Sequence, residues 1–210
     1  MADLLSCVSA VRAESLREVL IRSYATDEIG QQNYDCAIWE AVRATSAAPG
    51  FFEPITLRGV NAPTFVDGGL RANNPIELMI SESQSVWSDP LYGCVISIGT
   101  GIVPLKPIAS KSPKLHSLVQ SIENITTDAE VAARRFIRTN TGRSVREANR
   151  YYRFNVDQGM TEVDLADTEK MSLMKAMSEA YLEDHSHEIQ ACAKVLAFSP
   201  SSVRLEDVHS

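Results

Sequence analysis

The sequence predicts an α/β fold with a mostly parallel sheet and a helical C-terminal region, and three observations carry this prediction. Residues 64–86 have the pattern of a strand, a tight turn and a helix. Residues 94–98 form a near-continuous apolar run, which is typical of a parallel strand covered on both faces. Residues 164–197 have apolar side chains at helical spacing, so we expect the last part of the chain to be mostly helix.

The first part of the chain predicts a pair of strands. Residues 7–11 and 19–24 have strand composition, and a charged turn separates them. We therefore expect neighbouring strands or a hairpin. Residues 55–63 have the pattern of a further short strand and turn, which leads into the strand that begins at Thr64.

Between these strands, residues 35–50 predict a helix. Asp35 is placed to cap its first turn, and a Pro-Gly pair would end it. Ile38, Trp39 and Val42 lie within three or four residues of one another. We therefore expect these three side chains to form an apolar stripe that faces the sheet.

A carboxylate ends the strand that begins at Thr64. Asp67 follows the apolar pair Phe-Val and precedes two glycines, which permit φ > 0 and close backbone approach. In open α/β sheets, ligands bind at the carboxyl ends of the strands, so an acid held there by a tight turn is a candidate general base. Taken alone, this signal is weak, because Asp-Gly is also a common tight turn.

The segment after this turn predicts a helix from Pro75 to about Val86. Asn74 can cap it, proline suits its first position, and Glu77 completes an arrangement like a capping box. The chain thus runs from a strand through an acid-glycine turn into a helix.

Three segments in this order resemble one known family. A helix ends in Ala-Thr-Ser-Ala-Ala-Pro at residues 44–49, a strand ends in Asp-Gly-Gly at residues 67–69, and another ends in Ser-Ile-Gly-Thr-Gly at residues 97–101. Their order and spacing resemble the second half of patatin-like phospholipase domains. The resemblance implies a partial three-layer α/β/α domain over residues 1–156, followed by a helical extension and tail over residues 157–210.

The resemblance also implies the chemistry of a serine acyl hydrolase with a Ser-Asp dyad and no histidine. We expect no metal and no cofactor. The proton acceptor of the family's motif carries over to Asp67, and Gly68 and Gly69 complete the motif. The implied substrate is a phospholipid or another lipid acyl ester.

The nucleophile does not carry over from the family. The sequence has no Gly-x-Ser-x-Gly elbow and no glycine-rich segment that would supply oxyanion-hole amides. Both belong to the half of the family's domain that would precede Met1. We therefore expect no esterase activity from these 210 residues alone.

Other nucleophiles and ligands have less support in the sequence. Ser46 lies near the end of a helix among alanines, where small residues indicate close packing, whereas a nucleophile requires a strand-to-helix elbow. A Ser-His-Asp triad remains an alternative, although no motif marks any of the four histidines. The four cysteines are widely separated, so we expect buried, reduced thiols and no metal site.

Charge and composition limit the partners of the chain. A net charge of −7 argues against nucleic acid, because binding phosphates requires clustered cations. The first residues lack the cationic flank and apolar core of a secretory signal, and no apolar run is long enough to span a membrane. We expect a soluble, cytoplasmic protein.

One basic stretch stands out against this acidic background. From Arg134 to Arg153, seven arginines accompany a single acid, Glu147. This pattern fits either transient contact with anionic lipid at a membrane surface or a solvated helix face. The rival to a hydrolase is therefore a non-enzymatic, patatin-like remnant that binds lipid or a protein partner.

Overall fold

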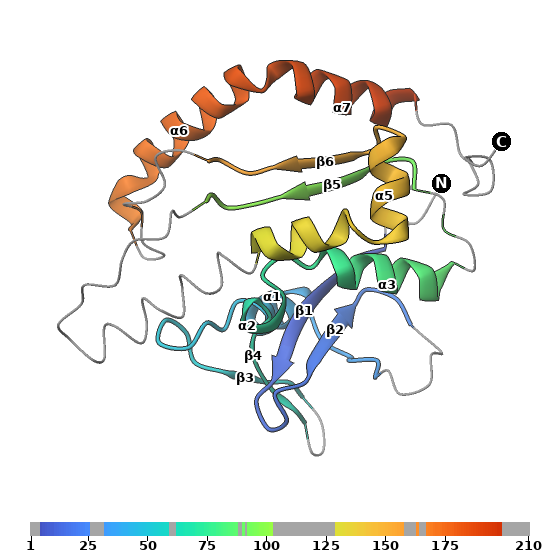
Figure 1. Cartoon of the computed structure of the whole chain (residues 1–210). Coiled ribbons are helices and arrows are strands. Elements are labelled where there is room, and N and C mark those ends of the chain that lie inside the picture. The colour runs from blue at the N-terminus through green and yellow to red at the C-terminus, as the bar shows by residue number, and fades with distance from the viewer. Residues whose placement is uncertain are drawn as a thin grey trace. The chain divides into compact units, whose positions relative to one another are not determined.

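The computed structural model describes residues 5–25, 32–58, 62–87, 90, 92–102, 129–157, 163 and 167–198. Contacts within the chain gather into two units, Met1–Val86 and Trp87–Ser210. Each unit has its own sheet and its own helices (Figure 1). The predicted mixed α/β class is confirmed, whereas the predicted domain boundary after residue 156 stays a prediction.

The sheet of the first unit has four strands in the order β2-β1-β4-β3. β1 (Cys7–Arg12) and β2 (Glu18–Arg22) form the expected antiparallel pair. β4 (Thr64–Asp67) pairs antiparallel with β1, and β3 (Ile55–Thr56) pairs antiparallel with β4. The parallel pairing that we predicted for most of the sheet is therefore absent from the described strands of this unit and occurs in the second unit.

Two helices cover opposite faces of this four-stranded sheet. Ala10, Ile21 and Phe65 are buried with Ala44 of α1 (Ile38–Thr45) in one core cluster. Arg22 follows Ile21 and so points to the other face, where it pairs with Glu82 of α3 (Ile76–Val86). The first unit is therefore layered helix, sheet, helix.

The face that α1 turns to the sheet is not the predicted one. Ile38 is 86% exposed, Trp39 57% and Val42 52%, so the prediction of an inward apolar stripe was wrong. The helix packs instead through Ala44, which is fully buried. A small side chain lets the helix approach the sheet closely, and hydrophobic periodicity weighs an alanine too little to detect this.

The start of α1 also differs from the prediction. Its N-cap is Ala37 rather than Asp35, and the Ala37 N–H donates to the buried Glu40 carboxylate at 2.8 Å. Arg58 pairs with the same carboxylate at 3.3 Å. The Glu40 side chain thus accepts the free backbone N–H at the start of α1, so no capping side chain is needed before the helix.

The second unit is built around a parallel pair of strands. β5 (Val95–Ile98) pairs with β6 (Tyr151–Phe154) in parallel register. Val95 and Ser97 are buried, but Ile98 is 77% exposed, so β5 is covered on one face and not on both as its apolar sequence suggested. The described helices of this unit are residues 129–136, α5 (Asn140–Glu147), the 3-10 helix η2 (Thr168–Lys170), α6 (Met171–Asp184) and α7 (Ser186–Phe198).

Asn155 fixes the Gly-Thr-Gly turn that follows β5. Its side-chain oxygen accepts the Gly101 N–H at 2.7 Å, and Gly101 has a φ of 114, which favours glycine. Its amide donates to Glu130 at 2.8 Å, and Glu130 also pairs with Arg153 at 2.7 Å. A Cβ added to Gly99 would lie 2.3 Å from the same side-chain oxygen of Asn155, so contacts with Asn155 account for both glycines of the turn.

Candidate active site

Asp67 lies at the end of β4, as the sequence predicted, and it is half-buried. The chain turns at Gly68 into the short helix α2 (Gly69–Ala72). The Gly69 N–H donates to Asp67 Oδ1 at 2.6 Å. Among the described residues, Asp67 Oδ2 has no hydrogen-bond partner, so this oxygen is available to a substrate or to a second catalytic group.

The surroundings of Asp67 favour its protonated form. Burial raises the pKa of the Asp67 carboxyl above its ordinary value of 3.8, and the hydrogen bond from the Gly69 N–H opposes this effect without cancelling it. Within the described part of the chain, no cationic side chain offsets the burial. A raised pKa makes a carboxylate a stronger base, which is the property that a proton acceptor for a hydroxyl requires.

The Asp-Gly-Gly turn is hydrogen-bonded to the loop after α1. The Asp67 N–H donates to Ala47 O at 3.1 Å, and the Gly68 N–H donates to Thr45 O at 3.2 Å. Ala47 is fully buried, and so is Ala44 one turn before it. The structure thus brings together two of the three sequence motifs, and the small side chains of the first motif allow the second to approach.

The two glycines of the motif allow close approach rather than an unusual backbone angle. Gly68 has a φ of −63, and a Cβ added to it would lie 2.2 Å from Ser9 O. A Cβ on Gly69 would lie 2.9 Å from Asp67 Oδ1. The positive φ that the sequence suggested is not used here, because both glycines are needed for space.

Ser9 is a neighbour of the motif that sequence reasoning missed. Its Oγ would lie 2.4 Å from a Cβ on Gly68, so the hydroxyl rests against the turn, although no hydrogen bond joins it to Asp67. The pairing of β1 with β4 places it there, because Ala10, the next residue of β1, is opposite Asp67 in the ladder. No local signal in the sequence indicates the partner or register of β1.

Ser46 has the structural position that its sequence context suggested. It is the C-cap of α1, and its Oγ donates to Val42 O at 2.7 Å. This hydroxyl is bound to the preceding turn of its own helix. The predicted helix after the motif is also present as α3, where Asn74 Oδ1 accepts the Ile76 N–H at 3.3 Å.

The described residues include neither a metal-binding cluster nor a membrane-spanning helix. No group of three or more His, Cys, Asp or Glu side chains there is arranged to hold a metal ion. All four cysteines are free, and Cys192 is buried as predicted whereas Cys7 is exposed. In the described ranges, no helix has the length and apolar character required to cross a membrane.

Fold and site together define an α/β protein that presents a half-buried carboxylate at the end of a strand. A family model described as patatin-like phospholipase matches residues 14–80, which include both hydrogen-bonded motifs. Residues 14–80 are therefore similar to part of a patatin-like phospholipase domain.

Phospholipases of animals and plants are similar to this chain. Calcium-independent phospholipase A2-gamma of Oryctolagus cuniculus is 26% identical over 204 residues, covering 94% of this chain and 25% of the relative. Intracellular phospholipase A2 of Caenorhabditis elegans is 31% identical over 132 residues, covering 56% and 12%. Phospholipase A I of Arabidopsis thaliana is 39% identical over 69 residues, covering 33% and 5%. The chain thus spans a quarter or less of the length of these relatives.

Proposed function

We propose that this chain contributes the catalytic aspartate of a lipid acyl hydrolase with a Ser-Asp dyad. The main support for this proposal is the environment of Asp67. Its carboxyl is half-buried and has a raised pKa, and one of its oxygens has no partner among the described residues. Two further facts support the proposal. The residue lies inside the segment matched by the family model, and the relatives named above are phospholipases.

In this mechanism Asp67 Oδ2 accepts the proton of a serine hydroxyl. The serine oxygen forms a bond to the carbonyl carbon of the ester, and as the tetrahedral intermediate collapses the alcohol leaves with the proton that Asp67 returns to it. Water then attacks the acyl-enzyme, Asp67 accepts a proton from that water, and it returns this proton to the serine oxygen as the fatty acid is released. Oδ1 stays bound to the Gly69 N–H throughout, which keeps the carboxyl oriented.

The serine must come from residues outside this sequence, because the 210 residues contain no Gly-x-Ser-x-Gly elbow. The proposed substrate is a phospholipid or another lipid acyl ester, in line with the names of the relatives. The proposed setting is cytoplasmic, with transient contact at membranes where such lipids lie.

A comparison of the isolated chain with the natural product that carries it tests this function. The 210-residue chain is expected to hydrolyse a short-chain nitrophenyl ester no faster than buffer. The endogenous protein, sized by intact mass, is expected to be longer, to hydrolyse phospholipid and to react with a fluorophosphonate serine probe. If the 210-residue chain hydrolyses the ester and this activity depends on Asp67, the chain must contain its own nucleophile, and the prediction is wrong. If the longer product does not react with the serine probe, the proposal of a serine hydrolase is wrong.

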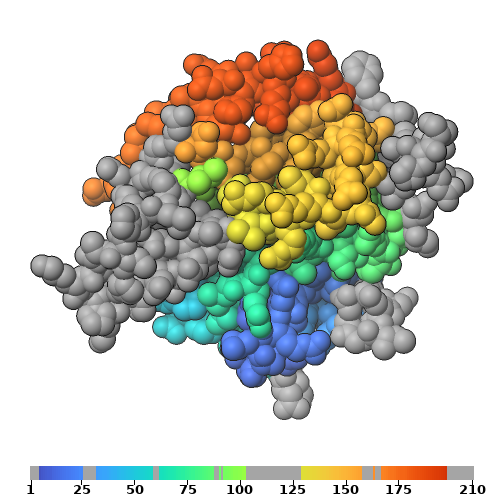
Figure 2. All heavy atoms as spheres, in the orientation of Figure 1, coloured from blue at the N-terminus to red at the C-terminus, as the bar shows by residue number. Residues whose placement is uncertain are grey.

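Exposed arginines favour lipid-surface binding as a second candidate function. Of the seven arginines in the basic stretch, Arg150 donates to Tyr92 O and Arg153 pairs with Glu130. The other five are exposed, and they lie on helical residues 129–136, on α5 and in the turn between these helices. This segment forms part of the surface shown in Figure 2. The five residues are Arg134, Arg135, Arg138, Arg143 and Arg146. Guanidinium groups near an anionic bilayer contribute about 1 kcal/mol each.

Co-sedimentation with vesicles that contain phosphatidylserine tests this candidate. Replacing both Arg134 and Arg138 by Gln is expected to weaken vesicle binding up to about 30-fold, the equivalent of about 2 kcal/mol. Replacing Lys175 and Lys194 by Gln removes the same charge from α6 and α7 and serves as the control. Equal losses in both variants would show that net charge, and not this stretch, governs binding.

A further inference from the structure

A pocket of about 300 Å³ lies in the first unit along β2, at the edge of the four-stranded sheet. Three arginines from the hairpin line it, together with three neutral side chains that can donate hydrogen bonds. These six residues are Arg12, Arg17, Arg22, Gln32, Tyr34 and Ser81. Its volume is at the lower end of the range for small-molecule sites.

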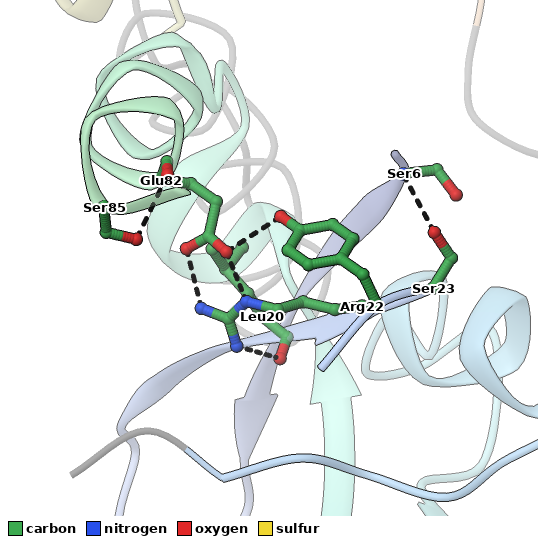
Figure 3. A network of polar contacts seen from close by, with 7 residues as sticks. Ser6, Leu20, Arg22, Ser23, Glu82 and Ser85 are labelled. Carbon is green, nitrogen blue, oxygen red and sulfur yellow. Dashed lines mark hydrogen bonds and ion pairs between the residues drawn. The ribbon is translucent and has the colours of Figure 1, made fainter. Parts of the chain in front are cut away.

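One of the three arginines is already neutralised. Arg22 donates to both carboxylate oxygens of Glu82, with Nη2 at 2.7 Å from Oε2, and Figure 3 shows the two groups facing each other from β2 and α3. Nη1 of Arg22 also donates to Leu20 O at 3.2 Å. Arg22 and Glu82 thus line the pocket as a neutral pair. The positive charges of Arg12 and Arg17 are not balanced by this pair.

The turn between β1 and β2 holds Arg12 and Arg17 next to each other. The Arg12 N–H donates to Arg17 O at 2.9 Å, and the Leu16 N–H donates to Arg12 O at 2.8 Å. Leu16 closes this turn at a φ of 54, a conformation that a branched side chain rarely adopts. The backbone of this turn therefore fixes the positions of Arg12 and Arg17, which both line the pocket.

Among the described residues, neither of these two arginines is hydrogen-bonded to a carboxylate. Arg12 forms only a long ion pair, with its Nε 4.0 Å from Glu14 Oε2, and this Nε has no hydrogen-bond partner. Burial raises the pKa of Tyr34, while Arg12, Arg22 and Arg17 all oppose that rise. The three arginines and Tyr34 thus line the same pocket, and the positive charges act on the tyrosine hydroxyl.

Glu18 is the remaining charged group that faces the pocket. Burial raises the pKa of its carboxyl and Arg71 opposes this, while its Oε1 is buried without a partner. Since Glu82 balances Arg22, Glu18 stands against two arginines, and the lining keeps an excess of positive charge.

We propose that this pocket binds the phosphate group of a small organic phosphate or of a phospholipid headgroup. Guanidinium groups match phosphate oxygens in geometry and charge, and the tyrosine, serine and glutamine side chains supply neutral donors for the remaining oxygens. Arg12 and Arg17 line the pocket, and their guanidinium groups are the charged donors that would bind the phosphate. Asp67 does not line the pocket, so this proposal does not depend on the hydrolase proposal.

Calorimetric titration of the 210-residue chain with glycerol 3-phosphate tests the proposal. We expect a dissociation constant below about 1 mM. Arg12→Gln and Arg17→Gln should each weaken binding about tenfold, because a hydrogen bond to a charged group is lost. Tyr34→Phe removes only a hydroxyl and should weaken binding severalfold. Arg58→Gln removes an equal charge outside the pocket and Asp67→Asn alters the proposed catalytic group, so both should bind as the parent does.

Vesicles of phosphatidic acid in phosphatidylcholine form the second arm of the experiment. Binding of glycerol 3-phosphate supports a soluble organic phosphate as the ligand. Binding only to phosphatidic acid vesicles, with the same sensitivity to Arg12, Arg17 and Tyr34, supports a lipid headgroup. The proposal is overturned if neither probe binds at 10 mM phosphate (about tenfold above the expected constant), or if Arg58→Gln weakens binding as much as the pocket variants do.

Discussion

Replacing Asp67 by Asn in the complete natural product should lower kcat for ester hydrolysis by about 10²- to 10⁴-fold and leave KM nearly unchanged. That range is typical of the loss of a general base. Asn has nearly the same shape as Asp, and its side-chain oxygen can still accept the Gly69 N–H, so the turn should persist. An amide cannot accept the serine proton, so the loss falls on the chemical step.

Steady-state kinetics on a phospholipid substrate, with circular dichroism to verify folding, give the measurement. Asp35→Asn removes an acid elsewhere in the same unit and should keep full activity. The acid limb of kcat/KM for the parent protein should lie above 3.8, since burial raises the pKa of Asp67. A folded Asp67→Asn protein with parental kcat would refute the assignment of the base.

Asp67→Asn also has a predictable effect on the free energy of unfolding. An acid whose pKa is raised by folding binds its proton more tightly in the folded state, so the free energy of unfolding falls as pH rises from 3.8 through the raised pKa. At neutral pH the parent carries this cost and the Asn variant does not. Asp67→Asn should therefore be as stable as the parent or more stable, which separates loss of chemistry from loss of fold.

Breaking the ion pair between Arg22 and Glu82 should destabilise the first unit more than any surface change. The two side chains are 4% and 6% exposed, and they join β2 to α3 across 60 residues of sequence. Arg22→Met leaves the Glu82 carboxylate buried with a hydrogen bond from Tyr24 but without its cation. The expected loss in the free energy of unfolding is about 3–5 kcal/mol.

Urea unfolding followed by circular dichroism measures this loss, and a double variant identifies its cause. Arg22→Met with Glu82→Leu removes both charges and should recover most of the stability, because well-packed apolar groups can replace a buried pair. Lys175→Met breaks an exposed pair with Glu179 and should change stability by less than about 0.5 kcal/mol. A double variant no more stable than Arg22→Met would mean that packing, and not the unpaired charge, is responsible.

The pH dependence of this ion pair follows from the pKa of Glu82. Desolvation raises that pKa, but the hydrogen bonds from Arg22 and Tyr24 and the charge of Arg22 together bring it below the ordinary value of 4.5. A depressed pKa means that the stabilisation is complete above pH 4.5 and is lost as the pH falls through the lowered pKa. Arg22→Met should lack this part of the acid dependence.

Sequence reasoning succeeded where the signal was local. The hairpin, the strand ending at Asp67 and the helix capped by Asn74 all follow from neighbouring residues, and the structure contains each of them. The fold class was also predictable, because these elements and the apolar strand β5 together require an α/β arrangement.

Sequence reasoning failed where the outcome depends on distant partners. Nothing near Arg22 indicates Glu82, and nothing near Ser9 indicates the Asp-Gly-Gly turn. The face of α1 was misjudged because its burial depends on alanine, whose small volume matters only once the opposing sheet is known. The antiparallel first sheet could not be read either, since strand composition carries no direction.

The outward orientation of Trp39 determines what the fluorescence of this protein can report. Trp39 is 57% exposed, and the second of the two tryptophans, Trp87, is 52% exposed. Both chromophores already contact water in the native state, so their emission should change little when the chain unfolds. It should respond instead to any molecule that covers the outer side of α1, which makes intrinsic emission a probe of association.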